Sequence, residues 1–406
     1  MKKCELLAPA GNFEKLKTAL YFGADAVYLG GKSFSLRSFS DNFDSDGLKS
    51  AVAYAHERGK KVYVTANIFA KNADFPALSE YLAYLQEIGA DAALVTDAGV
   101  LALAKKAAPR LPLHISTQAN TTNKYAARFW QEQGAERVVL ARELSIAEIA
   151  EIRAYCPRLE LEAFVHGAMC ISYSGRCLLS NYLAGRDSNR GECVQACRWK
   201  YHLRAEGKEG EIEAEEDGRG TYIFNSKDLN LSAHLASLAD AGVDSFKIEG
   251  RMKSAYYVAT VVNAYRRLMD GKLSAREAAA ELDTAAHRDY TTAFAFGDNP
   301  ETVNYADSQA AGTRVYAANV LEGAHAGGAA LVEMRNRFRL GDELEILSPS
   351  DSFGKRFAVD EMRGEDGENI ADAKLVQQKL RIFCPYELCS SDILRKVPEG
   401  ERRTDG

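Results

Sequence analysis

Long hydrophobic runs are missing from the 406-residue sequence, and no window approaches the roughly 18 consecutive apolar residues that indicate a membrane-spanning helix. Near the N-terminus, two lysines precede an apolar stretch that Pro9 and Gly11 interrupt within a few residues, unlike a secretory signal. These absences predict a cytoplasmic protein with no membrane partner. Thiols stay reduced in that compartment, so disulfides are not expected.

An excess of positive charge is also missing, because 51 Lys and Arg residues stand against 57 Asp and Glu, for a net charge of −6. This balance argues against indiscriminate nucleic-acid binding, so any contact with RNA must be local. Neither His-Glu-x-x-His nor Gly-x-Ser-x-Gly is present, which removes the metal and serine signatures of hydrolysis. No Gly-x-Gly-x-x-Gly follows the first expected strand, which disfavours a doubly wound dinucleotide-binding sheet.

Short apolar strands alternate with amphipathic helical stretches, which is typical of a parallel α/β fold. Eight strands are expected to begin near Glu5, Ala26, Val62, Ala92, Leu113, Arg137, Leu159 and Ser245. A glycine that can end a helix in the left-handed conformation precedes several of them, at Gly23, Gly89, Gly134 and Gly242. The repetition predicts a (β/α)8 TIM-like barrel over residues 1–300, with its chemistry at the carboxyl ends of the strands.

The seventh expected strand runs into an insertion, at about residues 168–224, that is far longer than a βα loop requires. A hairpin of Trp199–Arg204 with Thr221–Phe224 is expected within it. Near the C-terminus the pattern changes to short strands separated by Gly and Asp turns. We expect a small antiparallel β-barrel at 308–398 and a charged, unfolded tail at 399–406.

Four of the eight cysteines, Cys170, Cys177, Cys193 and Cys197, lie within 28 residues of the insertion. Such clustering indicates a shared metal or disulfides, and the expected compartment disfavours disulfides. Structural zinc sites favour two tight pairs, and the six residues between Cys170 and Cys177 are too many for one of them. The spacing favours a [4Fe–4S] cluster with one thiolate per iron, and zinc remains the alternative.

The segment Glu162–Ser180 reads Glu-x-Phe-x-x-Gly-Ala-Met-Cys-x4-Gly-x-Cys-x-Leu-Ser, which resembles the signature of the collagenase-like peptidase family U-32. The likeness extends through Leu6–Gly11, Tyr28–Gly31 and Phe246–Arg251. With its cysteine layout and C-terminal extension, the chain is most similar to the tRNA hydroxylation proteins of that family.

The resemblance implies formation of 5-hydroxyuridine at the wobble position of tRNA, with prephenate as a required metabolite. It leaves three alternatives: a peptidase, an oxygen-independent hydroxylase of another RNA, and a partner subunit in hydroxylation of a quinone ring.

Candidate catalytic and substrate-binding residues follow the eighth expected strand. Lys247 and Glu249 share one face of it, and Glu249 could pair with Lys247 or accept a substrate hydroxyl. Arg251 and Lys253 come at the start of the next helix, where barrels often bind anions, and could hold a dicarboxylate such as prephenate. An internal Glu–Lys salt bridge with basic surface residues is the alternative.

Other polar positions are candidates by their place in the chain. His166, four residues before Cys170, could be a proton donor, the base of a cysteine protease, or simply a hydrogen-bonded residue. Gln118 follows the fifth strand. Asn225, Lys227 and Asp228 form a further polar group of substrate-binding candidates, as Gln118 is, and Asp228 could cap the apolar helix that follows.

Two groups of arginines are candidates for RNA contact. Residues 186–204 hold five basic and two acidic residues, and the group Arg186, Arg190 and Arg198 is followed by Trp199, which could stack on a base. Arg335, Arg337 and Arg339 alternate, which predicts that all three share one strand face. A solvated strand face is the alternative for that second group.

Overall fold

The structure is a computed structural model that describes residues 3–36, 41–199, 225–297, 302–303, 312–398 and 400. The expected hairpin and tail lie outside the described residues, apart from Trp199 and Gly400. The chain divides into two compact units. The first comprises residues 1–20, 24–253 and 287–310, and the second comprises residues 21–23, 254–286 and 311–406.

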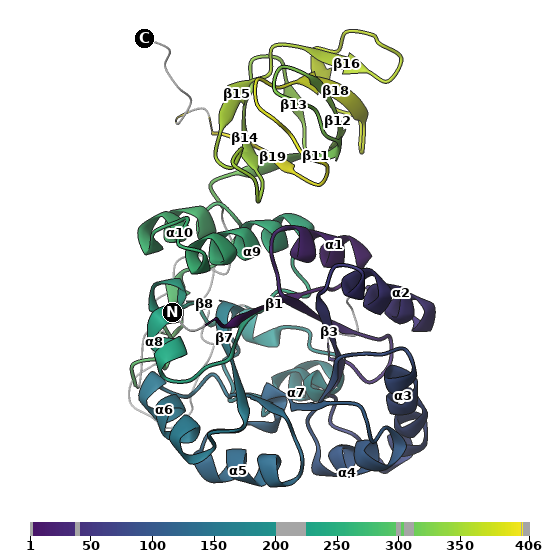
Figure 1. The fold of residues 1–406 in the computed structure, drawn as a ribbon, viewed down its shortest axis with the longest axis vertical. Coiled ribbons are helices and arrows are strands. Elements are labelled where there is room, and N and C mark those ends of the chain that lie inside the picture. Colours follow the sequence, from purple (N-terminus) through teal and green to yellow (C-terminus); the bar gives the residue numbers. More distant parts are fainter. Residues whose placement is uncertain are drawn as a thin grey trace, which may run out of the picture. The chain divides into compact units, whose positions relative to one another are not determined.

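The first unit contains a closed parallel barrel (Figure 1). Its strands are β1 (Glu5–Pro9), β2 (Ala26–Gly30), β3 (Lys61–Ala66), β4 (Ala92–Val95), β5 (Leu113–Ile115), β6 (Arg137–Val139), β7 (Glu160–Ala168) and β9 (Ser245–Ile248). Pairing follows the chain from β1 to β7, and β9 pairs in parallel with both β1 and β7, which closes the ring. The predicted TIM-like barrel is therefore confirmed, and all eight strands begin within one residue of the expected positions.

Helices alternate with these strands and surround them (Figure 1). They are α1 (Phe13–Tyr21), α2 (Ser45–His56), α3 (Phe75–Glu87), α4 (Ala98–Ala107), α5 (Lys124–Glu132), α6 (Ile146–Tyr155) and α8 (Leu235–Asp240). Side chains cap the first turns of α2, α4, α5 and α6, where Asp44, Asp97, Asn123 and Ser145 accept backbone N–H groups. The four expected glycines all have positive φ, as a left-handed helix ending requires.

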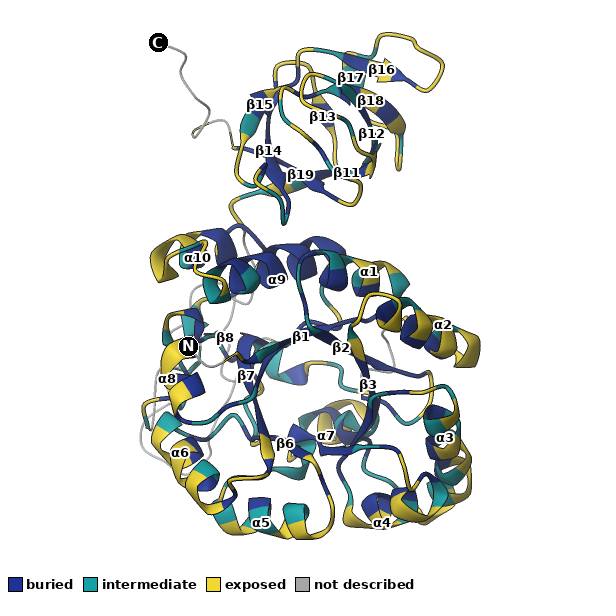
Figure 2. Cartoon of the chain, viewed as in Figure 1, coloured by how far each residue is buried: buried dark blue, intermediate teal, exposed yellow. Residues whose placement is uncertain are grey.

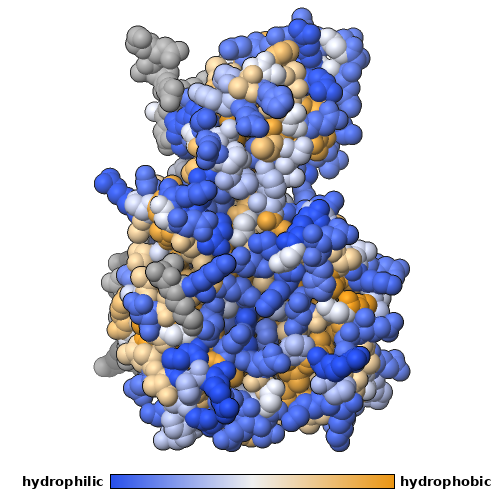
Figure 3. Space-filling view, viewed as in Figure 1, coloured by the Kyte–Doolittle hydropathy of each residue, from blue (hydrophilic) through white to orange (hydrophobic). Residues whose placement is uncertain are grey.

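Burial follows from this layering (Figure 2). All five residues of β2 are buried, because a parallel strand is covered on both faces and is apolar throughout. The helices bury one face and expose the other (Figure 2). The face of the molecule seen in Figure 3 is mostly hydrophilic, with hydrophobic surface in small patches. Among the described residues, no helix combines the length and apolar character needed to cross a bilayer.

The second unit joins α9 (Ala255–Met269) and α10 (Ala275–Leu282) to an antiparallel sheet. The sheet order is β15 (Arg356–Ala358), β14 (Glu343–Leu347), β19 (Ile393–Lys396), β11 (Val315–Glu322), β12 (Ala329–Met334), β18 (Lys379–Phe383) and β16 (Met362–Gly364). Alternate residues of β12 are buried against an apolar core. The described strands form an antiparallel half-barrel, since no pairing among them joins β15 to β16.

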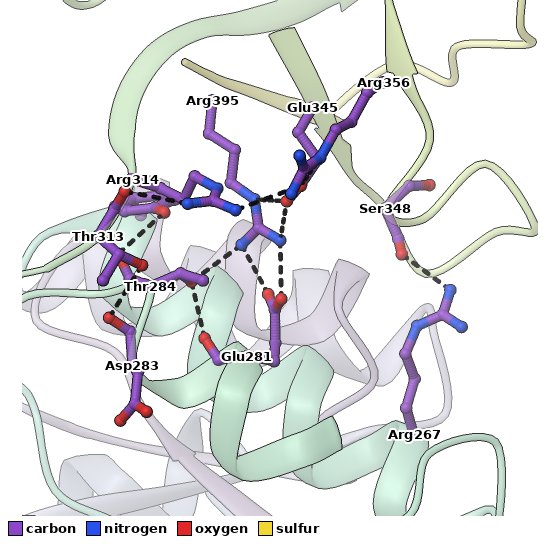
Figure 4. Close-up of polar contacts among 11 residues, drawn as sticks. Arg267, Glu281, Asp283, Thr284, Thr313, Arg314, Glu345, Ser348, Arg356 and Arg395 are labelled. Atoms are coloured by element: carbon purple, nitrogen blue, oxygen red, sulfur yellow. Dashed lines mark hydrogen bonds and ion pairs between the residues drawn. The ribbon is translucent and has the colours of Figure 1, made fainter. Parts of the chain in front are cut away.

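A buried arginine ties α10 to this sheet (Figure 4). Arg395 donates to both carboxylate oxygens of Glu281, each at 2.7 Å, and through Nε to Glu345 at 2.7 Å. Arg356 donates to the other oxygen of Glu345, also at 2.7 Å. Arg395 is buried, and its guanidinium is held by two carboxylates, as a buried cation requires.

A second charged network lies inside the barrel. Glu162 on β7 is fully buried and accepts hydrogen bonds from Lys247 Nζ at 2.7 Å and from Arg137 Nη1 at 3.0 Å. Arg137 also donates to Glu5 at 2.6 Å. Burial alone would raise the pKa of Glu162, but the charges of Lys247 and Arg137 outweigh it and lower that pKa below its usual value. The network therefore links β1, β6, β7 and β9, the strands around the closure of the ring.

We predict that Glu162→Ala destabilises the protein by about 3–5 kcal/mol, because it leaves two buried cations with too few carboxylates. Urea denaturation of the full-length protein measures the loss. The control is Glu151→Ala, which breaks an exposed pair with Lys124 (3.2 Å) and should cost less than about 1 kcal/mol. Equal unfolding midpoints for the two variants would contradict this account of the barrel interior.

Candidate functional site

The four clustered cysteines are brought together at the end of β7. This strand is nine residues long and leads directly into the cysteine segment. Cys170, Cys177, Cys193 and Cys197 all line one cavity of about 300 Å³. All four are free thiols; Cys170 is exposed and the other three are half-buried. Among the described residues, no three His, Cys, Asp or Glu side chains are grouped as ligands of a single metal ion.

The cysteine loop, residues 169–199, has little regular structure apart from α7 (Leu179–Ala184) and two short 3-10 turns, Ser188–Arg190 and Ala196–Arg198. Side chains of the loop hold its backbone instead. The Ser188 hydroxyl and the Asn189 amide both donate to the carbonyl of Cys177, at 2.8 and 2.9 Å. The position of Cys177 is thus fixed by bonds that do not involve its sulfur.

Several contacts attach the cysteine loop to the barrel. Arg190 donates to the carbonyl of Phe69 and to Asp74, both at 2.7 Å, beyond the end of β3. Ser174 donates its backbone N–H to Glu143, which follows β6, at 2.9 Å. Gly175 packs so closely that a Cβ built on it would fall against the backbone carbonyl of Gln118. The loop is therefore positioned by the barrel itself.

Two of the thiols, Cys170 and Cys177, are joined by a hydrogen bond. The Cys170 thiol donates a hydrogen bond that lowers the pKa of Cys177 to about 5, and the backbone N–H of Leu179 contributes to the shift. The same contact raises the pKa of Cys170. Cys193 Sγ accepts the backbone N–H of Gln195 at 3.4 Å and the Ser180 hydroxyl at 3.8 Å. These hydrogen bonds stabilise negative charge on the sulfur of Cys177, whereas burial raises the pKa of Cys197.

Charged side chains share the cavity with the thiols. They are Arg142, Glu143, Arg198, Glu249 and Lys253, together with the neutral Gln118. Burial lowers the pKa of Lys253, although Asp228 and Glu249 act in the opposite direction. Arg142, Arg198 and Lys253 are the cations of this wall and offer partners for an anionic ligand.

Of the predicted substrate-binding residues, Gln118 and Lys253 line the cavity, together with the catalytic candidate Glu249 and with Arg198 from the first arginine group. Arg251 does not line it. Arg251 is buried, and its Nη1 donates to Ser35 Oγ at 2.9 Å and to Thr65 Oγ1 at 3.0 Å. Arg251 therefore takes part in a polar cluster of the barrel mouth.

The predicted pairing of Lys247 with Glu249 is wrong, because Lys247 is bound to Glu162 inside the barrel. The alternative interpretation, an internal Glu–Lys salt bridge, is correct for Lys247, but its partner is Glu162 and not Glu249. A strand pattern places residues on faces, but it does not identify a partner 85 positions away.

The predicted helix cap at Asp228 is also wrong. Asp228 begins β8 (Asp228–Asn230), which pairs antiparallel with β7. Its carboxylate accepts Arg288 Nε at 3.0 Å, and Arg288 Nη1 donates to Asn225 at 2.9 Å. Asn225 and Asp228 are buried, and Lys227 between them is half-buried.

The predicted strand face of Arg335, Arg337 and Arg339 is wrong as well. Strand β12 ends at Met334, and the next strand, β13 (Phe338–Arg339), begins after a bend. Arg335 pairs with Glu333 at 3.1 Å and Arg337 with Asp372 at 2.6 Å. In the first arginine group, Arg186 is exposed, whereas Arg190 is bound to Asp74.

Sequence reasoning missed Arg142, Glu143 and Arg288. The first two follow β6 directly, so the rule that barrel chemistry gathers at the carboxyl ends of strands could have found them. Arg142 Nη1 donates to the carbonyl of Ala168 at 2.6 Å, where β7 enters the cysteine loop. No pattern in the sequence singles out Arg288.

Two family models match this chain: Peptidase family U32 over residues 11–305, and Peptidase family U32 C-terminal domain over residues 313–395. The chain belongs to peptidase family U32. This U32 protein is 39% identical over 407 residues to tRNA hydroxylation protein P1 of Bacillus subtilis (strain 168), with 97% of this chain and 95% of the relative covered.

It is 37% identical to tRNA hydroxylation protein P of Escherichia coli (strain K12), with 91% of each chain covered. The 23S rRNA 5-hydroxycytidine C2501 synthase of the same bacterium is 36% identical over 274 residues, which cover 68% of this chain and 40% of the relative. A crystal structure of the C-terminal domain of a Geobacillus thermoleovorans U32 peptidase is 28% identical over 21% of this chain and 93% of that chain, with a TM-score of 0.19.

We predict that Gly175→Ala disturbs the cysteine loop, because a methyl group would collide with Gln118 and alanine strains the backbone at φ +75°. The cysteines of the loop should then react faster with a thiol reagent in this variant than in the wild-type protein. Mass spectrometry measures the rate of modification of each cysteine. The matched control is Gly185→Ala, with φ +64° and nothing within 4 Å of the added carbon. If both variants react alike, backbone strain alone accounts for the effect and the close contact is unimportant.

His166 generates a prediction about pH. It lies in β7, is buried, and contacts the ring of Tyr290 at 5.4 Å between centroids. Burial lowers its pKa to about 3, so the imidazole is neutral at physiological pH. The unfolded chain binds this proton first, near pH 6.5, so His166 destabilises the fold as pH falls from about 6.5 towards 3.

Wild-type protein should therefore lose about 2 kcal/mol more stability between pH 7 and pH 5 than His166→Gln does. Urea denaturation at the two pH values makes the comparison, and NMR of the imidazole should show it neutral at pH 5. A His166 ring that is already protonated at pH 5 would contradict this assignment.

Proposed function

We propose that this U32 protein is a tRNA-modifying enzyme that hydroxylates the wobble uridine to 5-hydroxyuridine, with a [4Fe–4S] cluster and prephenate required. The observation that carries the proposal is the likeness along nearly the whole chain, including the C-terminal domain, to proteins named for tRNA hydroxylation. The ribosomal RNA relative is named for the synthesis of 5-hydroxycytidine, a 5-hydroxylated pyrimidine.

The thiol-lined cavity supports the cluster. A [4Fe–4S] cluster takes one cysteine thiolate per iron, and Cys170, Cys177, Cys193 and Cys197 would supply the four. The cluster would bring redox chemistry to the site. Ser180 and the backbone N–H of Gln195 donate to the sulfur of Cys193, and hydrogen bonds of that kind orient a ligand and influence its potential.

The charged wall supports an anionic metabolite. Prephenate carries two carboxylates, and Arg198 and Lys253 are cations that line the same cavity as the thiols. Glu249, next to Lys253 in that wall, can accept a hydrogen bond from a hydroxyl group. Arg251 is engaged with Ser35 and Thr65, so we assign metabolite binding to Arg198 and Lys253.

The reaction removes two electrons from the base when C5–H becomes C5–OH. An oxygen donor and a two-electron acceptor must therefore take part. A cavity that combines four thiols with neighbouring cations would suit such chemistry, because it could hold the proposed cluster and an anionic metabolite side by side.

Peptidase activity is the competing function, because the family bears that name and a Methanocaldococcus jannaschii relative named as an uncharacterized protease is 40% identical over 308 residues. A cysteine peptidase needs one nucleophile and a base. The four thiols are gathered at one cavity, whereas His166 is a buried strand residue outside the lining. This arrangement favours a shared ligand set.

We predict that Cys197→Ser loses iron, the brown colour and 5-hydroxyuridine formation together, because three thiolates should hold the cluster poorly. Nucleosides of tRNA from a strain lacking the gene, complemented with each variant, are measured by mass spectrometry. Iron and sulfide are measured in anaerobically purified protein, where about four of each per chain are expected. Circular dichroism checks that the barrel remains folded.

The matched control is Cys389→Ser, a half-buried cysteine of the second unit, which should keep iron and activity. A Cys197→Ser protein that hydroxylates fully without iron would end the cluster-based account. Peptide cleavage that survives loss of iron would favour the peptidase.

A further inference from the structure

Large hydrophobic side chains are exposed around the thiol-lined cavity. Ten are exposed in the described part of the first unit, and six of these lie in the cysteine loop or line the cavity; we call these six the cavity rim: Tyr173, Leu178, Tyr182, Leu183, Trp199 and Met252. Tyr173 and Met252 line the cavity, and Trp199 follows Arg198, which lines it too. Concentrated apolar surface at one place marks an interaction site, whereas scattered residues do not.

Helix α7 supplies two of the six, Tyr182 and Leu183, and Leu178 is the residue just before the helix. Leu179 and Ser180 line the cavity, and Tyr182 and Leu183 stand three and four positions after Leu179, so they share its face. Tyr182 is 80% exposed although the helix that carries it packs against the neighbouring 3-10 turns of the cysteine loop. The ring is thus presented to solvent from a fixed support.

The aromatic residues of the rim differ from the other exposed aromatic residues of the first unit. Tyr125 packs on Tyr155, Phe129 on Trp130, and Phe296 on His234, with ring centroids 4.8 to 5.4 Å apart. Within the described part of the chain, the rings of Tyr173, Tyr182 and Trp199 have no such neighbour. Three flat, open rings around one cavity are suited to stacking with the flat groups of a ligand.

The positive charge of the cysteine loop indicates that a ligand of the rim is negatively charged. The cysteine loop carries four arginines, at 176, 186, 190 and 198, against Asp187 and Glu192, so its net charge is +2, whereas the whole chain carries −6. Arg176 and Arg186 are exposed, and within the described residues Arg176 has no ionic partner. Open aromatic rings beside cations match the unpaired bases and phosphates of a single strand.

We propose that the cavity rim binds single-stranded RNA, with unpaired bases stacked on Tyr173, Tyr182 and Trp199 and with Arg176 and Arg186 at the phosphates. One base is thereby separated from its neighbours and enters the thiol-lined cavity. This inference rests on the proposed function and deepens it, because it defines the substrate as an unpaired nucleotide in a loop. An enzyme that acts on a base must take that base out of the stack to reach it.

The experiment measures the affinity of full-length protein for an RNA hairpin and for a fully paired duplex of the same length, by fluorescence anisotropy. The hairpin should bind more tightly. Tyr182→Ala and Tyr173→Ala should each weaken hairpin binding roughly 5- to 150-fold, the range for loss of one stacked base. Tyr182→Phe keeps the ring and should bind as wild type does.

Two further variants separate stacking from charge and from general effects. Arg176→Gln should lower the salt dependence of log K by about 0.7, as expected for one phosphate contact on a single strand, whereas Tyr182→Ala should leave that slope unchanged. Tyr125→Ala removes an equally exposed ring from α5 and should change neither quantity. Circular dichroism and cysteine reactivity confirm that each variant keeps its fold and its cysteine loop.

Wild-type affinity of both Tyr182→Ala and Tyr173→Ala for the hairpin would overturn the proposal, as would equal binding of hairpin and duplex. A dimer that Tyr182→Ala dissociates, with RNA affinity unchanged, would assign the rim to self-association. The proposed reaction is tested separately. If the gene deletion leaves 5-hydroxyuridine intact while the rim variants lose RNA, the hydroxylation assignment fails and the rim stands.

Discussion

Glu162 accepts hydrogen bonds from Lys247 on β9 and Arg137 on β6 with no exposure to solvent, and Arg137 extends the network to Glu5 on β1. These strands are the ones around the closure of the ring, so their register depends on a buried set of charges that must stay complete. Strand β7 then carries the chain out of the barrel into the cysteine loop. The segment Glu162–Ser180 therefore has two roles: its first residue stabilises the barrel, and its cysteines line the cavity.

The cavity at the end of β7 is assembled from several parts of the chain. Residues after β5, β6 and β9 contribute Gln118, Glu143 and Lys253, while the insertion contributes the thiols. This is the usual division in TIM barrels, where strands give rigidity and the loops at their carboxyl ends give chemistry. The long insertion after β7 adds two things to this common arrangement: a helix of its own, α7, and exposed aromatic side chains near the cavity.

Local pattern was enough to predict the barrel and the meeting of the cysteines. Strand starts follow from short apolar runs after helix-ending glycines, and close spacing guarantees that four thiols of one loop can converge. Pairings across the chain were not predictable in this way. Lys247 pairs with Glu162 and not with Glu249, which is nearer in the sequence. Asp228 lies in a strand beside β7, where its carboxylate accepts a hydrogen bond from Arg288, 60 positions along the chain. The bend after Met334 separated arginines that alternate in sequence, because one turn changes which side of a strand each residue occupies.

The hydrogen bonds that hold the cysteine loop affect the order in which the protein folds and takes up a cluster. Ser188, Asn189 and Arg190 hold the loop through backbone carbonyls and Asp74, and none of these bonds uses a sulfur. A zinc-finger peptide, by contrast, gains its fold from its metal. Here contacts with the barrel hold the thiol-bearing loop in place, so the proposed cluster would enter a site that is already formed. Insertion of the cluster would then be a step separate from folding, and a chain without the cluster could take one up without first unfolding.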